Sequence, residues 1–131
     1  MTKAHGAFEV ASWDEKTYGE LEGGGKLSLA SVKQDFTGDV TGDGAAQWLM
    51  CHRADGTAHF VGLQLVRGVV GESKGTFVLE TSGDFDGTTA TWTASVVPGS
   101  GTGELEGLSG RAEFGAPHGN QAAFDFDYQF E

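Results

Sequence analysis

The phenylalanines constrain the fold of this 131-residue chain more than any other feature. Near the C-terminus Phe124, Phe126 and Phe130 alternate with polar residues, which is the period of a β-strand with one buried face. If the strands are folded at the turns that the sequence marks, all nine phenylalanines fall on one face of an antiparallel sheet. Such a face belongs inside a closed barrel or a sandwich.

The positions of the turns are predicted from pairs of adjacent residues that contain glycine. Asp55-Gly56 and Asp86-Gly87 each lie between alternating runs, which predicts two-residue hairpin loops, and further turns are expected at Thr41-Gly42 and at Gly71 to Lys74. These turns fix a register for each strand pair. The predicted neighbours are His52 with His59, Cys51 with Phe60, Gln47 with Gln64, Gln34 and Gly62 with Leu49, Gly62 with Gly83, Gly83 with Ala90, and Thr81 with Trp92.

The turns divide the chain into eight strands, and helical signals are nearly absent. This number favours an all-β, eight-stranded antiparallel closed barrel over a sandwich. The chain length predicts a single domain, residues 1–131. The expected strands are Phe8 to Trp13, Leu27 to Gly38, Ala45 to Arg53, Thr57 to Val69, Gly75 to Phe85, Thr88 to Val97, Arg111 to Gly115 and Ala122 to Phe130.

The charge distribution limits the classes of partner. The formal net charge is −11, and the eight Lys and Arg residues are scattered, so neither a nucleic acid nor an anionic membrane is expected as a partner. The N-terminal segment has no apolar stretch of signal-peptide length, and the single cysteine, Cys51, cannot form an intrachain disulfide. A cytoplasmic location is the resulting prediction.

A ligand site is predicted where polar and small residues share the inward face. Gly62, Gly83 and Ala90 fall side by side and leave room, and the amides of Gln47 and Gln64 beside them need hydrogen-bond partners. A small, mostly apolar ligand with a carbonyl or hydroxyl group satisfies both, and a Gly62→Leu substitution should block its uptake without disturbing the fold. Alternatively, the glutamines bond each other and ordered water, and the glycines accommodate large neighbours. The predicted ligand-binding residues are Gln34, Gln47, Leu49, Cys51, Gly62, Gln64, Thr81, Gly83, Trp92 and Tyr128.

Few residues are predicted to carry acid-base or nucleophilic chemistry. Cys51 is expected inside among apolar residues, where a thiol is inert. The histidines, His5, His52, His59 and His118, are expected on the outer face or in loops, so no catalytic triad is predicted. His52 and His59 lack a third ligand nearby, so neither a metal nor another cofactor is predicted. Glu9 is the exception, because a bulge in the first strand would turn it inward.

An apolar patch is predicted on the outside of the barrel. An exposed patch that contains tryptophan is usually covered by another surface. We therefore predict a homo-oligomer, a dimer or trimer, and a monomer at micromolar concentration in sedimentation would contradict it. The predicted interface residues are Trp48, Met50, His52, His59, Val61 and Leu63.

The whole chain also resembles a bacterial family. The segments SWDEKTY (residues 12–18), DGTAHFVG (55–62), GTFVLETSGDFDG (75–87) and VVPGSGTGELEGLSG (96–110) are similar to those of the domain-of-unknown-function family DUF3224, which is grouped with allene oxide cyclase-like, calycin-like barrels. The resemblance implies an eight-stranded barrel with an apolar cavity. It also implies a glutamate where this chain has Gln64, and an amide cannot exchange protons usefully near neutral pH. From the residues alone, the run 96–110 is expected to cross irregularly between two strands at a barrel rim.

Three functions remain open at this level. The barrel could be a cyclase- or isomerase-type enzyme in which Gln47, Gln64 and Thr81 polarise a carbonyl group. It could instead be a non-catalytic carrier or sensor of a hydrophobic small molecule, which needs the same cavity. A solid barrel that serves only as an assembly partner is the third possibility.

Overall fold

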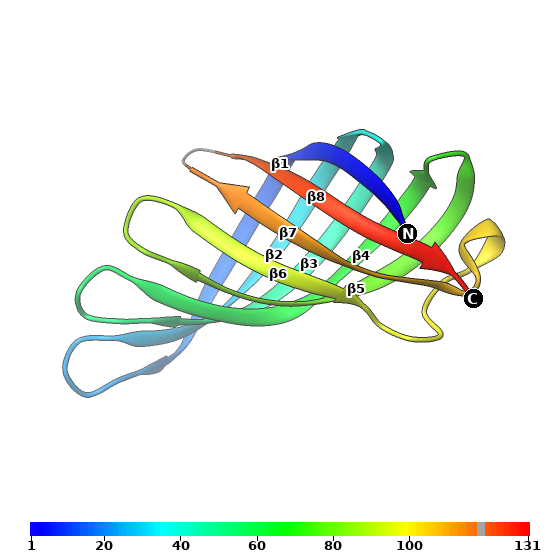
Figure 1. The fold of residues 1–131 in the computed structure, drawn as a ribbon. Coiled ribbons are helices and arrows are strands. Elements are labelled where there is room, and N and C mark those ends of the chain that lie inside the picture. Colours follow the sequence, from blue (N-terminus) through cyan, green and yellow to red (C-terminus); the bar gives the residue numbers. More distant parts are fainter. Residues whose placement is uncertain (118–119) are drawn as a thin grey trace.

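The computed structural model, which describes residues 1–117 and 120–131, is a closed antiparallel barrel (Figure 1). Within these residues eight strands follow one another around the barrel in chain order, and β1 closes it by pairing with β8. The predicted fold class is confirmed. None of the described helical residues forms a helix long and apolar enough to cross a membrane. The strands are β1 (Thr2–Glu20), β2 (Lys26–Gly38), β3 (Val40–His52), β4 (Ala58–Val70), β5 (Ser73–Phe85), β6 (Ala90–Val96), β7 (Leu108–Ala116) and β8 (Gln121–Phe130).

The aromatic residues fill the barrel interior, as the alternating pattern predicts. Seven of the nine phenylalanines are buried, Phe85 is partly buried, and Phe130 is exposed at the end of β8. The rings pack closely on one another: Trp92 stacks on Phe114 with ring centroids 4.9 Å apart, and Phe8 lies against Phe36 at 5.4 Å. Burial of these rings therefore decides which face of each strand points inward.

Strand β1 contains a bulge that changes which residues face the interior. Val10 pairs with Gln34 and Ser12 with Lys33, so Ala11 is an extra residue in the strand. Before the bulge even-numbered residues such as Phe8 point inward, whereas after it the odd-numbered residues do as far as Thr17, where a second irregularity begins. An inserted residue has this effect because side chains alternate along a strand with a period of two.

The predicted register of β3 is wrong by an odd number of residues. The hairpin between β3 and β4 has a three-residue loop, residues 54–56, closed by a hydrogen bond from Arg53 N–H to Thr57 O of 2.8 Å. Gly56 takes a φ of 90°, and the Asp55 carboxylate accepts a hydrogen bond from Thr57 N–H. The turn before β3 also falls at residue 39 rather than at Thr41-Gly42. Consequently Trp48, not Leu49, pairs with Gly62, and β3 shows the opposite face to the interior.

The other two predicted hairpin registers are wrong by two residues, which leaves the faces unchanged. The loop between β5 and β6 has four residues, so Gly83 pairs with Trp92 rather than with Ala90. The loop between β4 and β5 is Gly71-Glu72, so Gly62 pairs with Thr81 rather than with Gly83. All these side chains keep the inward orientation that the sequence predicts, because a shift of two residues preserves the alternation.

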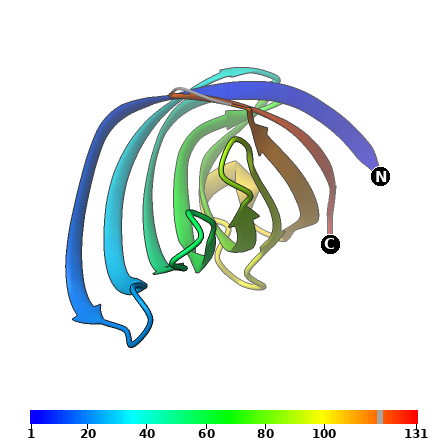
Figure 2. The ribbon, with the colours of Figure 1, turned by 90° about the vertical axis from the view of Figure 1, so that its left-hand side faces the viewer.

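The two ends of the barrel differ (Figure 2). Three hairpins, residues 21–25, 53–57 and 86–89, surround the end that faces the viewer in Figure 2. The connection from β6 to β7 crosses the far end and contains a short 3₁₀ helix, η1 (Gly103–Leu105). Leu105 of this helix is fully buried and belongs to the hydrophobic core. The Leu105 side chain therefore packs inside the far end, and the connection is an irregular crossing as predicted for this run.

Candidate functional site

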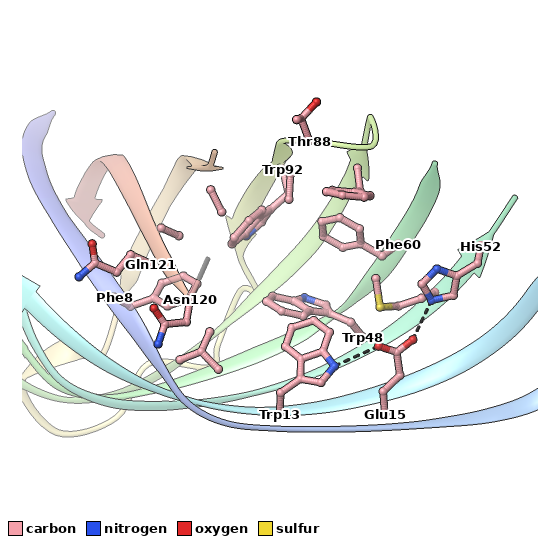
Figure 3. Close-up of a pocket in the computed structure, with 16 residues that line it drawn as sticks. Phe8, Trp13, Glu15, Trp48, His52, Phe60, Thr88, Trp92, Asn120 and Gln121 are labelled. Atoms are coloured by element: carbon pink, nitrogen blue, oxygen red, sulfur yellow. Dashed lines mark hydrogen bonds and ion pairs between the residues drawn. The ribbon is translucent and has the colours of Figure 1, made fainter. Parts of the chain in front are cut away.

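A cavity of about 420 Å³ lies at the end of the barrel that the three hairpins surround (Figure 3). Its walls are mainly apolar, and all three tryptophans of the chain contribute to them. Small residues of β6, β7 and β8 complete the wall, and a few polar groups lie at its rim. The lining residues are Phe8, Val10, Trp13, Glu15, Trp48, Met50, His52, Phe60, Phe85, Thr88, Ala90, Trp92, Ala116, Asn120, Gln121 and Ala122.

A hydrogen bond positions Trp48 in the cavity wall, and glycines lie close behind Trp48 and Trp92. Trp48 Nε1 donates to Thr81 Oγ1 at 2.9 Å, and this hydroxyl donates to Gly62 O at 3.2 Å. A Cβ at Gly62 would lie 2.8 Å from Trp48 Cδ1, and a Cβ at Gly83 would overlap Trp92. The two glycines therefore make room for the tryptophans, which is the alternative that the sequence left open, rather than for a ligand.

The polar side of the cavity centres on Glu15, which the bulge in β1 turns inward. Its Oε2 accepts hydrogen bonds from Ser28 Oγ at 2.6 Å and from His52 Nε2 at 2.7 Å. Its Oε1 accepts one from Trp13 Nε1 at 3.0 Å. Burial raises the pKa of the Glu15 carboxyl, but the hydrogen bonds from Ser28, His52 and Trp13 together outweigh burial and lower the pKa below the ordinary value of 4.5. Glu15 is therefore a carboxylate at neutral pH.

We expect Glu15 to stabilise the fold at neutral pH and to lose this effect in acid. Its pKa is lower in the folded than in the unfolded chain, so protonation favours the unfolded chain. The contribution is present above the ordinary pKa of 4.5 and is lost as the pH falls through the lower folded value. Urea unfolding of wild type and Glu15→Gln between about pH 7 and about pH 3 should show the stability difference shrinking on acidification. A difference that grows in acid would contradict the lowered pKa.

Only part of the predicted ligand-binding set lies at this cavity. Trp92 lines it, and Thr81 supports Trp48 from behind. Gln34 and Gln64 are buried elsewhere in the barrel, where Gln64 Nε2 donates to Gln34 Oε1 at 3.0 Å. Their other amide atoms, Gln34 Nε2 and Gln64 Oε1, have no hydrogen-bond partner among residues 1–117 and 120–131. The glutamines thus bond each other, as in the second reading of the sequence.

Four further predicted ligand-binding residues also lie away from the cavity. Gln47, Leu49 and Cys51 point to the outside of β3, because the three-residue loop reverses the faces of this strand. Tyr128 points inward, but at the other end of the barrel, where its hydroxyl lies 3.0 Å from the position of a Cβ at Gly71. The predicted inward orientation of Gln47, Leu49 and Cys51 is therefore wrong, whereas Tyr128 faces inward as predicted.

The same reversal of β3 moves three predicted interface residues into the cavity. Trp48, Met50 and His52 all line it and do not form an outer patch. His59, Val61 and Leu63 of β4 do face outward, and an apolar patch exists there with different members, namely Leu29, Leu49, Val61 and Leu63. The homo-oligomer stays a prediction.

The outer histidines pair with aspartates. His59 Nδ1 lies 2.9 Å from Asp84 Oδ1, and His5 pairs with Asp125. His118 lies outside the described residues. Of the histidines that the structure describes, only His52 lines the cavity, against the expectation that all of them lie on the outer face or in loops.

Sequence analysis missed Glu15, the main polar residue of the site. It anticipated a bulge in the first strand, but assigned the inward turn to Glu9, which instead faces outward and accepts a hydrogen bond from Gln121 Nε2 at 2.7 Å. The available signal was the run from Ser12 to Tyr18, in which Trp13, Glu15 and Thr17 share one face of a strand. Their inward orientation depends on Ala11, whose bulge carries no sequence mark.

Fold and site together define a small closed antiparallel barrel with an aromatic cavity open at one end and a carboxylate-histidine pair at its mouth. A family model described as "Protein of unknown function (DUF3224)" matches residues 4–128, and the chain belongs to this family. Comparison with curated proteins gives no match. The structure is similar to the crystal structure of a protein with unknown function from the DUF3224 family of Shewanella oneidensis MR-1, with 28% sequence identity, a TM-score of 0.81, and coverage of 100% of this chain and 98% of that chain.

Proposed function

We propose that the barrel binds a small, mostly apolar molecule in the cavity at its open end, with a carbonyl or hydroxyl group of that molecule beside His52. The observation that carries the proposal is the cavity itself, about 420 Å³ in volume and lined by six aromatic side chains. Pockets that bind small molecules have volumes of roughly 300–1,000 Å³, mostly apolar walls and a few convergent polar groups.

The composition of the wall favours a flat, unsaturated body for this molecule. Trp48, Phe60 and Trp92 meet at ring centroid distances of 5.5 to 5.8 Å, in tilted and edge-on contacts, and form an aromatic surface in the cavity wall. Flat apolar groups gain both area burial and favourable ring contacts against such a surface. The polar groups lie at the edges of the aromatic wall, with Glu15 and His52 on one side of the cavity and Asn120 on the other in Figure 3. A polar group of the ligand is therefore expected toward solvent and its apolar body toward the interior.

Filling the cavity should weaken binding without disturbing the fold. Ala90 is partly buried and lines the cavity, so we expect Ala90→Phe to weaken binding at least about tenfold by occupying the space. Thr91, the next residue of β6, is exposed on the outer face, and Thr91→Phe is the matched control that should bind like wild type. Binding is measured as quenching of tryptophan fluorescence by the flat bicyclic ketone β-tetralone, since all three tryptophans line the cavity.

Two results would count against this proposal. One is the absence of saturable quenching in the wild type, accompanied by native mass spectra that show no co-purified organic molecule. The other is equal affinity of wild type and Ala90→Phe, which would place the ligand elsewhere.

We also propose that the protein is related to the allene oxide cyclase-like barrels. The eight-stranded closed barrel and its apolar cavity support this relationship. A carrier or sensor needs only the cavity. A cyclase or isomerase also needs a group that moves protons, and the hydrogen-bonded pair of Glu15 and His52 favours this second candidate.

A further inference from the structure

The hydrogen bond between Glu15 and His52 fixes which nitrogen of the imidazole carries the proton. The three donors around Glu15 lower its pKa, so it is an ionised carboxylate that can only accept hydrogen bonds. His52 Nε2, 2.7 Å from Oε2, must then be the donor. In the neutral imidazole the other nitrogen, Nδ1, consequently has a free lone pair and can accept a proton.

This imidazole is accessible from the cavity. His52 is the last residue of β3, and Glu15 lies in β1. The His52 side chain is 29% exposed and the Glu15 side chain is 25% exposed. Figure 3 shows the pair on one side of the cavity beside Trp13 and Trp48, with Asn120 on the other side. A molecule against the aromatic wall would therefore lie between a base and an amide that can donate a hydrogen bond.

Proton transfer is the chemistry that this lining supports. Among the described lining residues, Glu15 and His52 are the titratable ones. Ser28 is fully buried and its hydroxyl donates to Glu15, and Cys51 lies on the outer side of β3, so neither presents a nucleophile to the cavity. A base held by a carboxylate, with no nucleophile beside it, is suited to moving a proton rather than to forming a covalent intermediate.

We propose that His52 is the catalytic base of an isomerase that acts on flat apolar carbonyl compounds with an enolisable C–H group between the carbonyl group and a carbon–carbon double bond, and that Glu15 positions it. This inference rests on the proposed binding function. The C–H bond next to the carbonyl breaks, its electron pair enters the conjugated enolate, and the proton moves to His52 Nδ1. Asn120 can donate a hydrogen bond to the enolate oxygen. The proton then returns from Nδ1 to another carbon of the conjugated system, so the double bond moves and product and substrate are isomers. No oxidant or co-reactant is consumed.

The first half of this reaction can be tested by hydrogen–deuterium exchange. β-Tetralone has enolisable C–H groups beside its carbonyl, and NMR in D2O follows the loss of their signal. Wild-type protein should accelerate the exchange relative to the same concentration of free imidazole. His52→Asn should lower the protein-catalysed rate about 100-fold, which is within the range for loss of a general base. The matched control is His59→Asn, because His59 is also paired with a carboxylate but lies on the outer face. It should exchange at the wild-type rate.

The role of Glu15 is tested by the pH dependence of the same rate. Glu15→Gln should keep the quenching of tryptophan fluorescence by β-tetralone but lower the exchange rate and change its pH profile, because an amide both donates and accepts hydrogen bonds and no longer holds the proton on His52 Nε2. An unchanged pH profile would assign Glu15 a structural role only.

The outcomes separate this inference from the proposed function. Saturable quenching by β-tetralone together with equal exchange rates for wild type and His52→Asn would overturn the catalytic role of His52 and leave the binding function standing. Absence of quenching in the wild type would overturn both.

Discussion

Gly62→Ala is expected to lower the free energy of unfolding by about 3 kcal/mol or more, because it forces backbone apart inside the barrel. A Cβ at Gly62 would overlap the carbonyl oxygen of Gln47 on the neighbouring strand β3, and would also lie 2.8 Å from Trp48 Cδ1. The carbonyl cannot move without separating β3 from β4, since these two strands are paired along their whole length. Guanidinium unfolding curves of wild type and variant measure the loss.

The matched control for this prediction is Gly115→Ala. Gly115 also lies in a strand, β7, but a Cβ there meets nothing within 4 Å in the part of the chain that the structure describes. Its substitution should leave the stability within about 0.5 kcal/mol of wild type. Equal losses at the two positions would show that the contact with Gln47 does not decide the effect. The result also bears on Gly62→Leu, which the sequence suggested as a harmless way to fill the interior and which the close approach of β3 now makes disruptive.

Trp92→Ala is expected to cost about 3–5 kcal/mol, the usual range when a large buried aromatic side chain is removed. Trp92 is 5% exposed and is the central ring of the cluster, stacked on Phe114 at 4.9 Å and in edge contact with Trp48 at 5.5 Å and Phe60 at 5.8 Å. The variant would leave these neighbours around a void that they cannot fill without moving. Thermal and denaturant unfolding both report the change.

Trp13→Ala provides the comparison for Trp92→Ala. Trp13 also lines the cavity but is 47% exposed and contacts one ring of the cluster, Trp48, at 6.1 Å. We expect a loss of about 1 kcal/mol, from reduced burial and from the hydrogen bond to Glu15. If the two variants were equally stable, the packing around Trp92 would not contribute to the fold as described.

The fold could be predicted because most strands have one clearly apolar face. In β8, Phe124, Phe126 and Tyr128 alternate with Asp125 and Asp127, and no other orientation buries the rings. Errors of two residues in the pairing of β4, β5 and β6 did not matter, since they leave each side chain on its own face. The number of strands and the closed barrel therefore followed from alternation and glycine turns alone.

Strand β3 could not be oriented in this way because both of its faces are apolar. Ala46, Trp48 and Met50 occupy one face and Gln47, Leu49 and Cys51 the other. The choice between them depends on whether the following loop has two or three residues, and Asp55-Gly56 is compatible with both lengths. The structure has three, with Gly56 at positive φ, and this single residue moved Trp48, Met50 and His52 from a predicted outer patch into the cavity.

The candidate site was hidden for a second, independent reason. Glu15 reaches His52 only because Ala11 adds a residue to β1, and bulges of this kind have no reliable sequence mark. His52 was therefore assigned to the wrong face and Glu15 was missed, because in each strand a one-residue shift changes which side chains face inward. The existence of both strands was nevertheless predicted. A site formed by two strands is predicted correctly only if the inward face of both strands is assigned correctly.

The far end of the barrel, which the connection from β6 to β7 crosses, bears on how a ligand of the proposed cavity would be exchanged. Leu105 of the 3₁₀ helix is fully buried at the end opposite the mouth, so we expect a ligand of the proposed cavity to enter and leave through the mouth. A second ligand molecule can then bind only after the first has dissociated. The rate of ligand exchange would then be limited by dissociation of the bound molecule, and a higher concentration of a competing ligand would not increase this rate.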